Sequence, residues 1–210
     1  MPRILLVEDS PTQAREISLV LEEAGFEMET ALTAREGWSR LAQRPFDLVL
    51  TDLLLPGESG FELCGWIKAD PERRKIPVLV MSRWADPANV LRGLAAGADG
   101  FMAKDREPAE IVSRIRRALA RVGQHAGHDE PVSTQVVFVG QRFNLSLTRD
   151  QLVEALCTAL EDVLLLNRRH QEAMGGLIKS AEALRKSEAL HQALQQTGAE
   201  PGSARQDNEA

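Results

Sequence analysis

The sequence predicts an α/β domain with a doubly wound, five-stranded parallel sheet, followed by a β-hairpin and a long α-helix. Three observations lead to this fold class. Short apolar runs alternate with longer amphipathic stretches over residues 1–121, as they do in consecutive βαβ units. The composition changes after Arg121 and two β-like runs follow. A helical periodicity then runs from residue 148 to about residue 195.

Five short segments are expected to form the strands of the sheet. Residues 4–7, 48–50 and 78–81 are continuous runs rich in Val, Ile and Leu, which suit parallel strands buried on both faces. Residues 27–31 alternate between polar and apolar side chains, a pattern typical of an edge strand. Residues 100–103 are a short fifth candidate.

Amphipathic helices are expected between these strands. Pro11 after Ser10 has the form of a first-turn proline behind an N-cap residue. Gly25 and Gly97 stand where helices should end. The expected helices lie near residues 11–24, 33–43, 60–69, 87–96 and 107–122.

Charge and composition restrict the location and the partners. The net charge of −6 argues against a nucleic-acid partner, because phosphate binding needs a basic face. We find neither a leading secretory segment nor an apolar run near 18 residues, so we expect a cytoplasmic protein without a membrane span. Cys64 and Cys157 do not have the spacing of a metal site, and reduced thiols are expected.

Each apolar strand of the predicted sheet is followed at once by a polar residue. Glu8 and Asp9 follow the first strand, Asp52 the third, Ser82 the fourth and Lys104 the fifth. The carboxyl ends of parallel strands lie at one edge of the sheet, where such folds place their ligand sites. Each residue alone suits an ordinary cap, turn or surface position, but their joint placement favours a site.

This set of side chains has a specific chemistry. Three crowded carboxylates repel one another unless a hard cation neutralises them, and oxygen ligands with open water positions favour Mg²⁺. A carboxylate bound to the cation can attack a phosphoryl donor. The cation, an ammonium group and a hydroxyl group then neutralise the three oxygens of the transferred group.

Four sequence blocks carry a resemblance to a known family. They are ILLVEDS at 4–10, DLVLTDLLLPGESG at 47–60, VLVMS at 78–82 and GADGFMAK at 97–104. The interval from Asp52 to Ser82 is 30 residues, and the interval from Asp52 to Lys104 is 52 residues. Over residues 3 to about 121, the blocks resemble the signatures of bacterial two-component receiver domains, and the two intervals match those of the chemotaxis response regulators.

The resemblance implies a flavodoxin-like sheet with strand order 2-1-3-4-5 and a phosphoacceptor at Asp52, phosphorylated by a sensor histidine kinase. It further implies that Ser82 and Lys104 contact the phosphoryl group and that Phe101 is the aromatic switch residue. Such a receiver catalyses only its own phosphorylation and dephosphorylation, so no other enzymatic activity is expected. The implied Mg²⁺ ligands are Glu8, Asp9, Asp52 and the backbone carbonyl of Leu54.

The sequence departs from the family pattern at two positions. Asp105 follows Lys104 where the family usually has proline, and Arg83 follows Ser82 where the family usually has a small residue. Arg83 could bind phosphate or obstruct the phosphodonor, and the sequence does not decide between these effects.

The second part of the chain is expected to contain a linker over residues 122–134, a hairpin over 135–147 and a helix over 148–195. Thr148 and Gln151 have the spacing of a capping box at the start of this helix. A two-stranded hairpin is marginal in water, so it must pack on the helix, on the receiver or on another protomer. Residues 196–210 have the composition of a disordered tail.

Apolar residues of the long helix follow a heptad pattern with Asn167 at an a position, which predicts a coiled-coil homodimer. The alternative is a helix that folds back over its own hairpin. Gly175 and Gly176 leave open a hinge, a helical-hairpin turn or a close helix crossing. The seam consists of Val153, Leu156, Leu160, Val163, Asn167, His170, Met174, Leu177, Ala181 and Leu184.

The leading hypothesis is a phosphorylation-switched module that signals through protein contacts and dimerisation. The alternatives are a phosphate sink, a relay intermediate, and a truncated N-terminal part of a hybrid sensor kinase. His170 and His191 lack the acidic residue and proline that follow a phosphotransfer histidine. A cluster of arginines is expected to be a solvated face or part of a partner surface; it consists of Arg114, Arg116, Arg117 and Arg121.

Overall fold

The computed structural model describes residues 1–82, 87–104, 106–122 and 131–197. It divides into two compact units, Met1–Glu161 and Asp162–Ala210, which we treat separately. Arg83, Asp105, most of the predicted linker and nearly all of the predicted tail lie outside the described residues.

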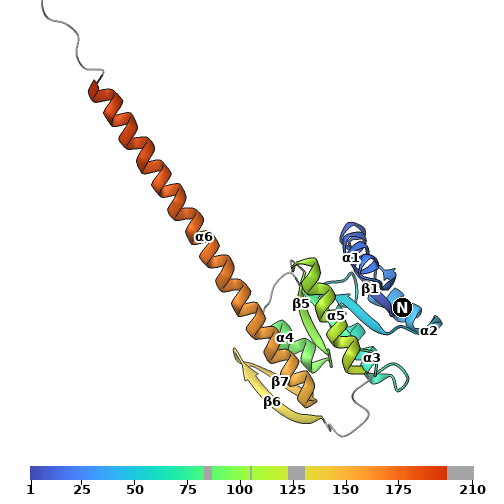
Figure 1. Ribbon diagram of the computed structural model, residues 1–210. Helices are drawn as coiled ribbons and strands as arrows, with labels where there is room; N and C mark the ends of the chain where they lie inside the picture. Colours follow the sequence, from blue (N-terminus) through green and yellow to red (C-terminus); the bar gives the residue numbers. More distant parts are fainter. Residues whose placement is uncertain (83–86, 105, 123–130, 198–210) are drawn as a thin grey trace, which may run out of the picture. The chain divides into compact units, whose positions relative to one another are not determined.

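The first unit contains a five-stranded parallel sheet with the order β2-β1-β3-β4-β5, which confirms the predicted fold class (Figure 1). The five strands are β1 (Arg3–Val7), β2 (Glu27–Ala31), β3 (Leu48–Asp52), β4 (Val78–Ser82) and β5 (Gly100–Ala103). The five helices between and after them are α1 (Pro11–Glu23), α2 (Ala34–Gln43), α3 (Gly60–Ala69), α4 (Pro87–Ala95) and α5 (Pro108–Val122).

Side-chain caps explain where three of these helices begin. The Ser10 hydroxyl accepts a hydrogen bond from the backbone N–H of Gln13, with Pro11 in the first turn of α1. Ser59 and Glu62 form a complete capping box at the start of α3. The Thr33 hydroxyl caps α2 by accepting a hydrogen bond from the backbone N–H of Glu36. These caps determine where α1, α2 and α3 begin.

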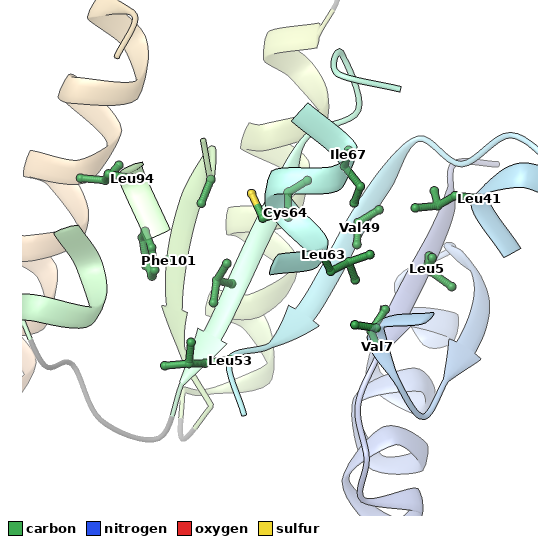
Figure 2. Packing of buried hydrophobic residues seen from close by; sticks show 14 of the residues in the cluster. Leu5, Val7, Leu41, Val49, Leu53, Leu63, Cys64, Ile67, Leu94 and Phe101 are labelled. Atoms are coloured by element: carbon green, nitrogen blue, oxygen red, sulfur yellow. The ribbon is translucent and has the colours of Figure 1, made fainter. Parts of the chain in front are cut away.

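Alternate residues of the strands point to two apolar layers. In β1, Leu5 and Val7 pack with α2, α3 and α4, whereas Ile4 and Leu6 pack with α1 and α5. Figure 2 shows Leu63 and other side chains of α3 packed against β3 in the first layer. Since both faces of the sheet are covered, the strands can be apolar throughout, as the sequence predicted.

The hairpin consists of β6 (Val132–Phe138) and β7 (Gln141–Leu147), which pair antiparallel. β6 begins earlier than residue 135, so the end of the predicted linker belongs to the strand. The turn is tight, with positive φ angles of 48° at Val139 and 74° at Gly140. Glycine adopts this conformation readily, whereas a β-branched valine does so only at a cost in backbone strain.

The hairpin packs on the receiver, one of the three predicted packing surfaces, and Ala155 near the start of the last helix packs against the same apolar cluster. Phe143, Leu145 and Leu147 of β7 are buried in the same apolar cluster as Leu94 of α4 and Phe101 of β5. Strand β7 lies against α4, as Figure 1 also shows. The hairpin therefore completes the apolar layer on this side of the sheet.

The last helix, α6 (Arg149–Thr197), begins with the predicted capping box. The side chain of Gln151 also donates a hydrogen bond to Asp99 in the receiver, with 3.3 Å between Gln151 Nε2 and Asp99 Oδ1. The helix continues without a break through Gly175 and Gly176, so these two residues form no helical-hairpin turn.

The described side chains of the α6 seam are exposed, including the apolar ones that the heptad pattern uses. The side chains of Asn167 and His170 lie outside the described ones. Of the helices that the structure describes, none has the length and apolarity needed to cross a bilayer. The exposed seam residues are Val153, Leu156, Met174, Leu177, Ala181 and Leu184.

The prediction that the α5 arginines form a solvated face is wrong for Arg114. This residue is 2% exposed, and its guanidinium donates a hydrogen bond to the backbone carbonyl of Phe101. Arg116 is exposed and donates to the carbonyl of Ala24. A periodicity of charge does not reveal that one member of the cluster points at the sheet.

Candidate functional site

The carboxyl ends of β1 and β3 place the candidate site. Asp52 is the last residue of β3 and pairs with Met81 of β4, while Val7 ends β1 beside Thr51. Glu8 follows β1 directly and its backbone N–H donates to the carbonyl of Ala31. The strand register therefore brings residues from distant parts of the sequence to one edge.

Three predicted carboxylates meet at this edge. Each of Glu8, Asp9 and Asp52 offers an oxygen, and these oxygens lie within 4.8 Å of one another. Glu8 and Asp52 are buried, whereas Asp9 is exposed. A cluster with one open side can hold a cation and admit a second molecule.

Lys104 binds two of these carboxylates. Its Nζ atom lies 2.7 Å from Glu8 Oε2 and 2.7 Å from Asp52 Oδ2, and its side chain is only 10% exposed. The backbone N–H of Lys104 donates to the carbonyl of Ser82 at 3.0 Å. The residue that begins the loop after β5 is therefore held by both its backbone and its ammonium group.

Burial raises the pKa of Glu8 above its ordinary value. The hydrogen bond and the positive charge of Lys104 oppose this effect, and the negative charge of Asp52 adds to it. The Ser10 backbone N–H also donates to Glu8, at 3.4 Å. A positive charge next to the buried Glu8 carboxylate, such as that of Lys104, therefore helps to keep this carboxylate ionised.

The backbone around Asp52 is closely packed. The Leu54 N–H donates to Asp52 Oδ1 at 3.2 Å, and the Thr51 hydroxyl donates to the Asp52 carbonyl at 3.0 Å. A Cβ atom at Gly60, the first residue of α3, would overlap that same carbonyl oxygen. The Leu54 side chain is 74% exposed and stands beside the site.

Ser82 and Phe101 occupy the two strands on the far side of Asp52. Ser82 ends β4 and pairs with Ala103, so its backbone lies beside that of Lys104. Phe101 is 7% exposed and packs toward α4 in the first apolar layer (Figure 2). Of the predicted site residues, the side chains of Glu8, Asp9, Asp52 and Lys104 thus lie close together.

One contact at the site was missed by the sequence analysis. The Oε1 atom of Gln13 accepts a hydrogen bond from Lys104 Nζ at 3.1 Å. Gln13 lies in the first turn of α1, directly behind the Ser10 cap. Its place just after the first strand could have indicated that Gln13 lies near the site. A glutamine in an amphipathic helix, however, does not stand out by residue type.

A doubly wound sheet with clustered carboxylates and a bridging lysine at its carboxyl edge defines a receiver-type signalling domain. Residues 4–116 match the family model described as the response regulator receiver domain. The chain belongs to this family.

Relatives of known sequence and structure agree with this assignment. The phosphate regulon transcriptional regulatory protein PhoB of Rhizobium meliloti is 35% identical over 121 residues, which cover 58% of this chain and 53% of PhoB. The DNA-binding response regulator MtrA of Mycolicibacterium smegmatis is 33% identical over 129 residues, which cover 61% of this chain and 53% of MtrA. This chain thus spans about half the length of both relatives.

Two solved structures have the same receiver fold. The signal receiver domain of a signal transduction histidine kinase from Syntrophus aciditrophicus is 37% identical, with a TM-score of 0.55, and the match covers 61% of this chain and 96% of that domain. The chemotaxis response regulator CheY4 of Vibrio cholerae is 28% identical, with a TM-score of 0.54, covering 56% of this chain and 98% of CheY4.

Proposed function

We propose that this chain is a response regulator of a two-component phosphorelay that accepts a phosphoryl group on Asp52 from a sensor histidine kinase. The observation that carries the proposal is the ammonium group of Lys104, which binds Asp52 and Glu8 at 2.7 Å in a chain of the receiver family. The receiver would occupy residues 1–121, and the hairpin and α6 would carry its output.

The proposed reaction transfers a phosphoryl group from a phosphohistidine. An oxygen of the Asp52 carboxylate attacks phosphorus, so that a P–O bond forms while the P–N bond breaks. The imidazole leaves with the bonding electron pair and takes up a proton. Lys104 and Ser82 would contact oxygens of the transferred group and neutralise their charge.

The carboxylate cluster fits a Mg²⁺ ion, because its donors are hard oxygens and one of them is exposed. Glu8, Asp9 and Asp52 would hold this ion, together with the carbonyl of Leu54. The bound ion would supply a positive charge that brings the anionic donor to an anionic acceptor.

Substitution of the acceptor tests this function directly. Asp52→Asn should abolish labelling by acetyl phosphate in the presence of Mg²⁺. Asp47→Asn is the matched control, because Asp47 lies just before β3 and is exposed. Asp47→Asn should be labelled like the wild-type chain, and labelling that survives in Asp52→Asn would refute the assignment.

We propose that the output is a homodimer formed through α6. Support comes from the exposed apolar residues at heptad positions, among them Leu177 and Leu184. Leu177→Glu, at a d position, should yield monomers in sedimentation experiments. Ala183→Glu, which lies outside the seam on the same helix, should remain dimeric. A wild-type chain that is monomeric with and without phosphorylation would contradict the dimer.

A second candidate is the N-terminal part of a larger sensor protein. The Syntrophus relative supports it, because that receiver belongs to a signal transduction histidine kinase.

The relatives PhoB and MtrA are named as a transcriptional regulatory protein and a DNA-binding response regulator. A DNA-binding assay with this chain tests our expectation that it has no nucleic-acid partner. A phosphate sink would accept the phosphoryl group without any change in the association of α6.

A further inference from the structure

We infer that Gln13 is a positioning residue that holds the Lys104 ammonium group at the phosphorylation site. This inference rests on the proposed function. Gln13 Oε1 lies 3.1 Å from Lys104 Nζ, although the two residues are 91 positions apart in the sequence. Their contact joins the start of α1 to the end of β5.

The ammonium group of Lys104 has three protons and three acceptors. Glu8 and Asp52 accept at 2.7 Å, and Gln13 is the third acceptor. Because the Lys104 side chain is only 10% exposed, water has little room to replace a missing acceptor. Each of the three contacts therefore restricts the direction of the ammonium group.

The three acceptors differ in what the reaction demands of them. Asp52 takes the phosphoryl group, and both Asp52 and Glu8 belong to the proposed Mg²⁺ ligands. Gln13 has neither task, so its hydrogen bond can persist while the two carboxylates change partners. It would keep Lys104 directed toward the oxygens of the incoming group.

A neutral acceptor suits this position. The site already contains three carboxylates within 4.8 Å, and a fourth anion would repel a phosphoryl donor. An amide oxygen instead accepts a hydrogen bond from Lys104 without adding charge. The N-cap fixes the backbone of Gln13, because its N–H donates to the Ser10 hydroxyl at 3.4 Å.

The test compares Gln13→Met with Gln43→Met in the full chain. Methionine keeps the length and helix propensity of glutamine but removes the acceptor, and Gln43 is an exposed residue at the end of α2. Two quantities are measured: the rate of labelling by acetyl phosphate with Mg²⁺, and the exchange of the Lys104 ammonium protons with water by NMR.

We expect Gln13→Met to slow labelling by about three- to tenfold, the worth of one hydrogen bond, and to speed exchange of the Lys104 protons. Gln43→Met should change neither. An unchanged labelling rate or unchanged proton exchange in Gln13→Met overturns the inference. Labelling that persists in Asp52→Asn would instead overturn the proposed function, so the two failures can be told apart.

Discussion

Gly93 of α4 lies against the ring of Phe101 in β5 so closely that the contact excludes any side chain at position 93. A Cβ atom at Gly93 would overlap Phe101 Cζ and would lie 2.6 Å from Phe101 Cε1 and 2.8 Å from Phe61 Cε1. Phe101 therefore packs directly on the backbone of α4, the helix against which β7 also packs. The position of this ring and the position of α4 are coupled.

Gly93→Ala should reduce the free energy of unfolding by about 1–3 kcal/mol, because the new methyl group displaces the Phe101 ring. Gly65→Ala in α3 is the control, since a Cβ atom there meets nothing within 4 Å. It should be neutral or stabilise the helix by up to about 1 kcal/mol. Chemical denaturation measures both, and equal stability of the two variants would contradict the close packing.

Leu145→Ala should release the hairpin from α4. Truncation of a buried leucine costs about 2–5 kcal/mol, and an undocked two-stranded hairpin is marginal in water. Amide hydrogen exchange in β6 and β7 should become faster. Val137→Ala, at a residue 63% exposed on the paired strand, should leave exchange unchanged. Strong protection of the hairpin in Leu145→Ala would show that it is held by other contacts.

The two thiols should differ in reactivity. Burial raises the pKa of the Cys64 thiol to about 12, so it remains protonated and covered at pH 8, whereas Cys157 is exposed. A thiol reagent should therefore modify one cysteine in the folded chain and two after unfolding. Cys157→Ser should remove the fast reaction and Cys64→Ser should not. Rapid labelling of Cys157→Ser would argue against a buried Cys64.

Binding of Mg²⁺ should depend on pH through Glu8. Because burial raises the pKa of Glu8 above its ordinary value of 4.5, its neutral form persists to a higher pH than usual. The ion needs the carboxylate, so affinity should fall as pH falls through this raised pKa, by up to about tenfold per pH unit. Titration calorimetry at several pH values measures the effect.

The control for the pH dependence is Glu36→Gln. Hydrogen bonds from the Leu32 N–H and from Arg40 lower the pKa of Glu36, so this group stays ionised across the same range. Its removal should leave the Mg²⁺ profile unchanged. Glu8→Gln should bind more weakly and lose the titration step, and a step that survives in Glu8→Gln would have to come from another group.

The sheet and most of the site could be predicted because they depend on local patterns and on one topological rule. Apolar runs identified the strands, and the shared carboxyl edge brought Glu8, Asp9, Asp52 and Lys104 together. The spacing of Thr148 and Gln151 also predicted the capping box at the start of α6. These features require no knowledge of which surfaces meet in three dimensions.

The remaining features depend on tertiary contacts. The burial of Arg114 follows from the rotation of α5 relative to the carbonyl of Phe101, which charge spacing does not specify. The contact of Gln13 with Lys104 depends on how closely α1 approaches the end of β5. The packing surface of the hairpin remained open because the apolar face of β7 could have been covered by several partners.

Burial of Phe143, Leu145 and Leu147 in the first apolar layer has a consequence for where the domain ends. The family match stops at residue 116, but the compact unit extends to Glu161. The compact unit that contains the receiver therefore extends beyond the residues matched by the family model. A chain shortened to residues 1–121 would expose the apolar side of α4 to solvent, and it would be expected to self-associate at concentrations where the longer chain does not.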